Sequence, residues 1–372
     1  MKKIIKIIGF LVFAFAACVV ILSCAKKKSI SSRKPDENVD SSKWIDNLID
    51  GKFAAQKENK KLLLFFSADD SDEASIEFKN NLFNTQEFID YATKEYVLVN
   101  LDFSDSLFAQ TQIEDDFTSE QKKAADSLYA KLNENLRDAT MYNVTGSPTF
   151  FILTKEGYVV TELIFEQIAT SIDDFKNLLE TEREQIDYYF SVFESASSGN
   201  KLERIESINE LFSITDVQHR YLLADLSRYV VENDKNNESG SVSAHIFAIA
   251  NANAVQAYLD DDSEGASKEF AKAAENKFLS PEEKQQCYYT AGYLFAQSGA
   301  TDYKKIKDYF QKAYDAAPES ENAAMIIQMV NMFDEDYSAD YEADFDSDDE
   351  AETDFEEAGN ISETNVGEND SN

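Results

Sequence analysis

Apolar residues follow two different periods along the first half of the chain, and the two periods predict different elements. Short apolar runs of strand length occur at 62–66, 96–101, 150–153 and 159–164. Apolar residues recur at helical spacing over 44–54, 76–91 and 119–140, and again from Ser171. A strand–helix–strand start, a hairpin that turns at 155–157 and a closing helix predict an α/β domain over 43–180, with a central mixed sheet and flanking helices.

Beyond residue 181 the strand signals stop and one helical pattern follows another. Short breaks separate these patterns, at 197–200, 215–216, 233–240, 260–265, 280–281 and 298–299. Short breaks favour antiparallel packing of neighbouring helices. Residues 181–333 are therefore predicted to form an all-α domain.

Two adjacent stretches of this helical region share an order of small and aromatic residues. In 287–318 the shared places are filled by Tyr288, Gly292, Phe295, Ile306, Phe310, Ala313 and Pro318. The stretch before it shows the same order and ends near Pro281. The pair resembles tetratricopeptide (TPR) repeats, which implies a concave face that binds peptides or proteins. The alternative is an ordinary helical bundle, since such residues are common in helical cores.

The first 23 residues have the pattern of an export signal. Lys2, Lys3 and Lys6 precede an apolar stretch, 7–22, and Cys24 stands just before a return to charge. The pattern resembles a bacterial lipoprotein signal peptide, which implies that Cys24 is lipidated and begins the mature protein. Cys18 is the alternative acceptor, and an uncleaved anchor helix is the alternative for the whole stretch. We expect an exported protein, tethered to a membrane through a flexible segment at 24–42.

The charge of the chain is strongly acidic and unevenly distributed. The 372 residues carry a formal net charge of -36, and no Lys or Arg follows Lys312. This balance excludes nucleic acid as a partner, because phosphate binding requires Lys and Arg. The sequence has two histidines, His219 and His245. Two are few for a metal site or for acid–base catalysis that depends on histidine. Segment 334–372 is rich in Asp and Glu, which predicts a disordered tail. The alternative is that its aromatic residues form a short motif that binds a basic partner.

The segment from Trp44 to about Leu179 resembles the thioredoxin superfamily, especially its exported members. The resemblance lies in four stretches, at 59–61, 66–70, 82–88 and 142–150. The last stretch is the most specific, and it implies that Pro148, preceded by Ser147, is a cis-proline facing the active-site loop. In redox-active relatives the groove beside this proline holds an extended peptide by main-chain pairing.

The two cysteines that redox-active thioredoxins space C-x-x-C are absent from this chain. Their positions hold Asp72 and Ser75, and neither side chain can attack a disulfide or resolve a mixed one. An Asp at a helix start is a good capping residue, so we predict a stabilised helix start and no catalytic residue. The alternative is that Asp69, Asp70, Asp72 and Glu73 form an acidic site for a divalent cation.

Cys287 is the single thiol left if Cys18 is removed with the signal peptide and Cys24 is lipidated. No internal disulfide can then form. Cys287 lies on an apolar helix face beside Tyr288 and Tyr289, which predicts a buried side chain rather than a reactive thiol.

These observations predict a membrane-anchored lipoprotein of a bacterial envelope, on the periplasmic or cell-surface side. We expect it to bind a protein or peptide partner as an adaptor or chaperone-like module, with no enzymatic activity, cofactor or metal. The first alternative is a protein related to thiol–disulfide oxidoreductases that acts with Cys287 or with cysteines of a partner. The second is a weak binder of divalent cations.

Overall fold

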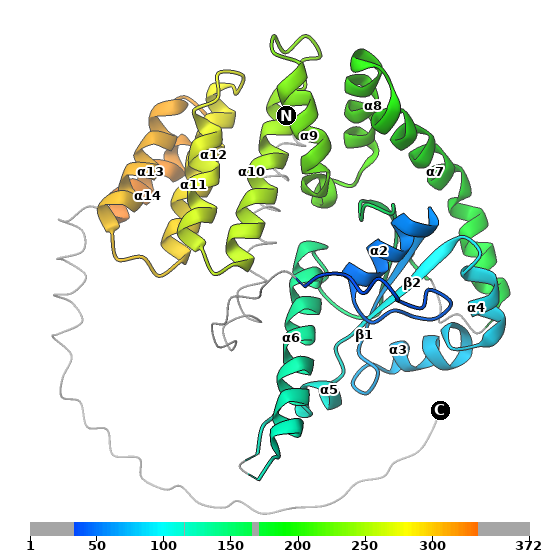
Figure 1. Ribbon diagram of the computed structural model, residues 1–372. Helices are drawn as coiled ribbons and strands as arrows, with labels where there is room; N and C mark the ends of the chain where they lie inside the picture. The colour runs from blue at the N-terminus through cyan, green and yellow to red at the C-terminus, as the bar shows by residue number, and fades with distance from the viewer. Residues whose placement is uncertain (1–32, 115, 166–170, 334–372) are drawn as a thin grey trace, which may run out of the picture.

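The computed structural model of the chain describes residues 33–114, 116–165 and 171–333. A sheet domain, residues 33–165, is followed by a helical unit, residues 171–333, whose helices form an arc leading away from the sheet (Figure 1). The predicted signal peptide with Cys24 and the predicted acidic tail lie outside the described residues. Within the described ranges, no helix has the length and apolar character needed to cross a bilayer.

The sheet domain is built on strands in the order β2-β1-β3-β4. Their bounds are β1 Lys61–Ser67, β2 Tyr96–Asp102, β3 Thr149–Leu153 and β4 Val159–Glu162. β1 runs parallel to β2 and antiparallel to β3, and β3 and β4 form the predicted hairpin. All side chains of β1 from Leu62 to Phe66 are buried, because helices cover both faces of the sheet. The predicted mixed sheet with flanking helices is confirmed.

The helices of the sheet domain follow the predicted pattern in part, with a break inside one predicted helix and one short helix, α5, that the spacing did not predict. Their bounds are α2 Leu48–Glu58, α3 Glu73–Phe78, α4 Gln86–Ala92, α5 Asp105–Ala109 and α6 Ser119–Met141. The helix predicted over 76–91 is instead broken, because the π-helical turn η1 (Lys79–Phe83) follows α3 and Thr85 caps a new helix, α4. The apolar spacing continues across the break, so it did not reveal the interruption.

The chain before α2 is extended, whereas the spacing of apolar residues predicted a helix over 44–54. The N–H of Ile45 donates to Leu98 O at 2.8 Å, and Ile45 O accepts from Asn100 N at 2.8 Å. Ile45 thereby forms a short parallel bridge with β2. The main chain becomes helical only at Leu48, because pairing with the edge of the sheet satisfies the polar groups of the residues before it.

The end of the predicted tether is attached to α2. Arg33 forms an ion pair with Asp50 at 2.8 Å, and the N–H of Asp36 donates to the same carboxylate at 2.8 Å. Asp50 is buried, and Val39 packs against the core next to it. The chain is therefore attached to the domain from Arg33 onwards, ahead of the predicted boundary at residue 43.

One long helix, α7 (Ile172–Ser198), joins the sheet domain to the helices that follow. It begins at a capping box formed by Ser171 and Asp174, at the predicted position, and packs on β4. The same helix then continues without interruption through residue 180. The predicted domain boundary thus falls inside a continuous helix that belongs to both parts of the molecule.

The remaining helices pack mainly on their neighbours in sequence. Their bounds are α8 Lys201–Ile214, η2 Val217–Leu223 (3-10), α9 Ala224–Asn233, α10 Val242–Leu259, α11 Ser263–Ala274, α12 Pro281–Gln297, α13 Tyr303–Ala316 and α14 Ala323–Met332. The two predicted repeat units correspond to the pairs α10–α11 and α12–α13. The all-α region predicted after the sheet domain is confirmed.

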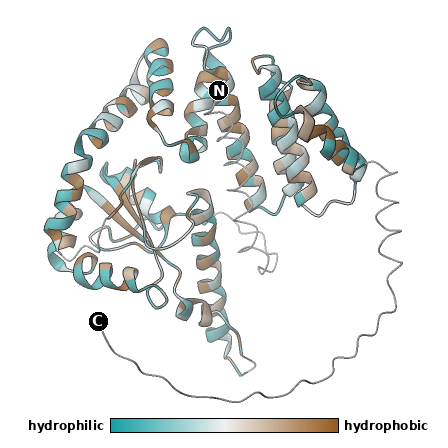
Figure 2. Cartoon of the chain, turned by 180° about the vertical axis from the view of Figure 1, so that it is seen from behind, coloured by the Kyte–Doolittle hydropathy of each residue, from teal (hydrophilic) through white to brown (hydrophobic). Residues whose placement is uncertain are grey.

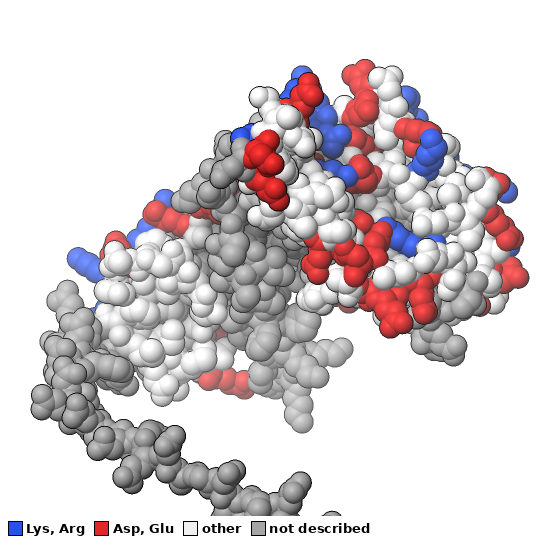
Figure 3. All heavy atoms as spheres, turned by 90° about the horizontal axis from the view of Figure 1, so that it is seen from below, with Lys and Arg blue, Asp and Glu red and all other residues white. Residues whose placement is uncertain are grey.

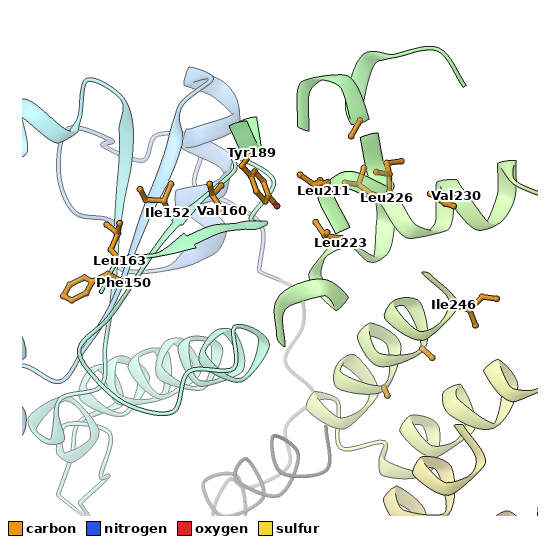
Figure 4. Close-up of a cluster of buried hydrophobic side chains, with 14 of the residues drawn as sticks. Phe150, Ile152, Val160, Leu163, Tyr189, Leu211, Leu223, Leu226, Val230 and Ile246 are labelled. Atoms are coloured by element: carbon orange, nitrogen blue, oxygen red, sulfur yellow. The ribbon is translucent and has the colours of Figure 1, made fainter. Parts of the chain in front are cut away.

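The apolar core runs without a break from the sheet into the helical unit. One buried cluster extends from Phe150 of β3 through Tyr189 of α7 to Leu211 of α8 and on to Phe310 of α13. Figure 4 shows Tyr189 between the side chains of the sheet and Leu211. A second cluster, which includes Tyr142, covers the other face of the sheet, and the strands are apolar along their length (Figure 2).

Candidate functional site

Asp72 and Ser75 lie where β1 delivers the chain to α3. Asp72 is the N-cap of α3, and its carboxylate accepts from Ala74 N at 3.3 Å and from Ser75 N at 3.1 Å. The predicted capped helix start is confirmed, and a cap of this kind contributes about 0.5–2 kcal/mol to stability. Ser75 is fully buried; its hydroxyl donates to Asp72 Oδ2 and accepts from Ala68 N at 3.3 Å.

The bond between Ser75 and Asp72 joins the two positions that a redox-active relative would link by a disulfide. The Ser75 hydroxyl uses both its donor and an acceptor site, and the Asp72 carboxylate receives two N–H donors and one hydroxyl. Thiol exchange requires a thiolate and a second, resolving thiol. In the described structure these two positions therefore hold a hydrogen-bonded carboxylate and hydroxyl, and no thiol.

The loop with Pro148 lies at the same end of the sheet as this turn. In the register of β1 with β3, Phe66 stands opposite Thr149, which places Pro148 beside the end of β1. The Ser147–Pro148 peptide bond is cis, as the resemblance implies. Residues 145–147 are exposed, and the main chain of Ser147 makes no hydrogen bond within the described structure.

The acidic side chains of the β1–α3 turn serve separate structural contacts. Asp70 accepts from Asp105 N at 2.8 Å and Ser106 N at 2.7 Å, and these contacts, led by the one with Ser106, lower the pKa of Asp70. Asp69 pairs with Lys79, although burial raises the pKa of Asp69. Across the described ranges, no group of three or more His, Cys, Asp or Glu is placed to hold a metal ion. The acidic residues predicted as a cation site do not form one here.

Clusters of acidic side chains lie on the face of the molecule that is seen from below. Figure 3 shows Asp and Glu gathered in clusters on this face, with Lys and Arg beside them. Asp69, Asp70 and Asp72 all belong to the turn. A partner that approaches this turn meets a negative surface.

Sequence reasoning did not single out three residues that support the turn. Ser104 Oγ accepts from Asp69 N at 2.8 Å and donates to Asp102 Oδ1 at 2.5 Å. Lys79 Nζ lies 4.0 Å from Asp102 Oδ2. Parallel pairing of β1 and β2 brings these residues together, since Ser67 and Asp102 are opposite each other. The available signal was the position of Asp102 at the carboxyl end of a strand predicted to neighbour β1.

Cys287 is the one cysteine of the described residues, and it lies in α12, far from the β1–α3 turn (Figure 1). Its side chain is fully buried, and burial raises the pKa of its thiol well above the usual range. A buried thiol of this kind supplies almost no thiolate at neutral pH. The predicted burial of Cys287 is confirmed.

Two family models match separate parts of the chain. A model described as a thioredoxin-like domain matches residues 53–182, and one described as the C-terminal domain of an uncharacterised protein matches residues 242–338. No curated protein matches the chain.

Among solved structures, a chain described as a DsbH oxidoreductase aligns with 43% of this chain and 93% of its own length, at 15% identity and a TM-score of 0.26. The family match and the observed sheet topology carry the assignment: residues 53–182 form a thioredoxin-like domain with a helical region after it.

Proposed function

We propose that this chain is an envelope protein that binds protein or peptide segments and does not itself exchange thiols and disulfides. The observation that carries the proposal is the hydrogen-bonded pair of Asp72 and Ser75 at the two cysteine positions of the thioredoxin-like domain. The third cysteine of the sequence, Cys287, is buried in another part of the molecule. Binding is the part of thioredoxin function that does not require a thiol.

The exposed loop at Ser147 and Pro148 is the proposed contact for an extended peptide. The free N–H and C=O groups of Ser147 are available to pair with another main chain. The helix pairs α10–α11 and α12–α13 supply a second surface, which we assign to a TPR-like protein-binding module. Two recognition surfaces on one chain support an adaptor or chaperone-like role.

We further propose that the protein is anchored to a bacterial membrane through a lipid on Cys24. The first residues support this, because a basic start is followed by an apolar stretch and then by Ser23 and Cys24. Cys24 is the residue that would accept the lipid. Palmitate labelling of the wild type and of C24A and C18A variants tests it. Label lost only in C24A supports the assignment, and label that persists in C24A overturns it.

The wild-type protein should show no insulin-reducing activity with dithiothreitol, whereas the double variant D72C/S75C should show turnover. The reason is that the variant restores the two thiols to a turn that still has the local shape of a thioredoxin site. D126C/Y129C, on the surface of α6, is the matched control and should stay inactive. Wild-type turnover that C287S abolishes would overturn the proposal and favour the oxidoreductase alternative.

A photo-crosslinking residue at Gly146 should capture a protein partner in intact cells. A side chain is tolerated there, because a Cβ at Gly146 meets nothing within 4 Å. The same residue at Lys94, exposed at the opposite end of the sheet before β2, is the matched control. A discrete adduct at Gly146 that is absent at Lys94 supports the proposal. Equal adducts, or none at Gly146, would count against a peptide-binding role for this loop.

A further inference from the structure

The last described helix, α14, has an apolar outer face. It lies at the far end of the arc of helices and packs on α13 (Figure 1). None of its ten residues is charged. Ile326 and Val330 are buried, whereas Met325 and Met332 are 42% and 55% exposed. The end of a stack of helix pairs usually turns a polar face to solvent, so this face of α14 is suited to packing against a further segment.

The apolar surface continues from the carboxyl end of α14 onto the start of α13. The ring of Phe333 stacks on the rings of Tyr303 and Phe310, with centroids 6.2 Å and 5.9 Å apart. Phe310 is fully buried, but Tyr303 is 59% exposed. We call Tyr303, Met325, Met332 and Phe333 the terminal patch. It is an exposed apolar surface built from both helices of the last pair.

The chain leaves the described structure at this patch. Phe333 is the last described residue and stacks on the first turn of α13, so the residues that follow start beside the patch. Tyr337, Tyr341 and Phe345 come after Phe333 at intervals of four residues. This interval allows apolar rings to share one side of a helix. Segment 337–345 therefore carries an apolar stripe that matches the terminal patch in character and begins within a few residues of it.

Charge also favours this segment as the occupant of the patch. Acidic residues separate its three rings, and it contains no Lys or Arg. Apart from its N-cap, Asp302, the first turn of α13 has no acidic residue, and this end of the helix is the positive end of its dipole. Lys304 is exposed there, and Lys307 follows Tyr303 by one turn on the same side of the helix. An acidic segment is attracted to such a surface.

We propose that segment 337–345 of this chain folds back on the terminal patch and closes the end of the helical unit. Its three rings cover the apolar side chains of the patch, and its acidic side chains lie beside Lys304 and Lys307. The occupant is the chain's own segment rather than a second copy, because a short linker keeps its effective concentration at the patch high. The start of α13 is then the basic partner that the aromatic residues of the acidic tail recognise.

Photo-crosslinking within the full chain tests this contact. Benzoylphenylalanine in place of Tyr341 keeps an aromatic ring in the segment. Irradiation should join it to peptides covering 303–310 or 323–333, in a product with the mass of one chain. The same residue in place of Phe355, outside the segment, is the matched control and should give at least threefold less of this product. A product with the mass of two chains, or no adduct on these peptides, overturns the proposal.

Amide hydrogen exchange of the full chain measures the same contact without a probe. In Y337A/Y341A/F345A, protection of peptides covering 303–310 and 323–333 should fall at least threefold, because the patch loses its cover. F355A is the matched control and should behave as the wild type. Unchanged peptides of α10 and α11 would separate this local effect from global unfolding. Equal protection in the wild type and the triple variant overturns the proposal.

The charge part of the proposal has its own test. K304E should lower the yield of the crosslink from position 341 about twofold, because it places a negative charge beside an acidic segment. Added salt should lower the yield of the wild type in the same direction. K235E, at an exposed lysine between α9 and α10, is the matched control and should leave the yield unchanged. Equal losses in K304E and K235E would overturn the assignment of the basic surface to α13.

Discussion

Replacing Tyr189 by Ala should lower the free energy of unfolding by about 3–5 kcal/mol, the range for large aromatic residues removed from a core. Tyr189 is 1% exposed, and its ring lies in the cluster shared by the sheet domain and the helical unit. The neighbouring Tyr188 on α7 is 50% exposed and contacts Glu210 through its hydroxyl at 2.9 Å. Y188A removes exposed area and one surface hydrogen bond, so its effect should stay within about 1 kcal/mol.

Urea unfolding followed by tryptophan fluorescence and by circular dichroism measures both variants. The sequence has one tryptophan, Trp44 in the sheet domain, whereas circular dichroism reports mainly the helices. Because the core is continuous through α7, the two signals should change together in the wild type. Two separate transitions, or equal losses in Y189A and Y188A, would contradict a shared core.

Lowering the pH from 7 towards 4 should destabilise the helical unit by about 3 kcal/mol through His245 alone. The side chain is 1% exposed, with Nε2 2.8 Å from Asn209 Oδ1 and Nδ1 3.0 Å from Ser227 Oγ. Since Asn209 Oδ1 only accepts, Nε2 carries the proton and Nδ1 accepts from Ser227. The imidazole is therefore fully bonded in its neutral form.

Burial lowers the pKa of His245 to about 4, below its unfolded value of about 6.5. A base with a lowered folded pKa stabilises the fold fully above its unfolded pKa and loses that contribution as the pH falls towards the folded pKa. NMR titration of the imidazole signals measures this directly, with an H219Q variant to assign the two histidines. A transition of His245 near pH 6.5 would show that its surroundings are not dry.

The elements with a clear period were predictable from the sequence, and those set by tertiary pairing were not. The spacing of apolar residues identified β1, β2 and the full length of α6. It could not show that Ile45 pairs with β2, because the two apolar residues Trp44 and Ile45 are too few to define a period of their own and fit the helical spacing of the residues after them. A boundary was predicted at residue 180 because the strand signals stop there, although α7 continues through it.

The β1–α3 turn was predictable because its chemistry is local. Asp72 is the N-cap of α3, and it accepts a hydrogen bond from the N–H of Ser75, three residues further along the chain. Contacts of such short range can be predicted from neighbouring residues. By contrast, Arg137 of α6 donates to Leu259 O, and His219 of η2 contacts Tyr142 O, about 120 and 80 residues away along the chain. Single residues at such separations carry no spacing signal, so these contacts between the sheet domain and the helical unit appear only in three dimensions.

The order of the strands sets a delay during synthesis of the chain. β1 is central, but its antiparallel neighbour β3 follows after about 80 residues, so roughly 4–16 s pass before β3 leaves the ribosome. Until then, the β1 edge that pairs with β3 has no partner. Its segment Leu62–Phe66 is uncharged and apolar, which is the composition of an aggregation-prone strand. Charged neighbours enclose it, with Lys60 and Lys61 before it and Asp69 and Asp70 after it. Besides their contacts in the folded state, we expect these charges to act as gatekeepers that oppose self-association of the unfinished chain.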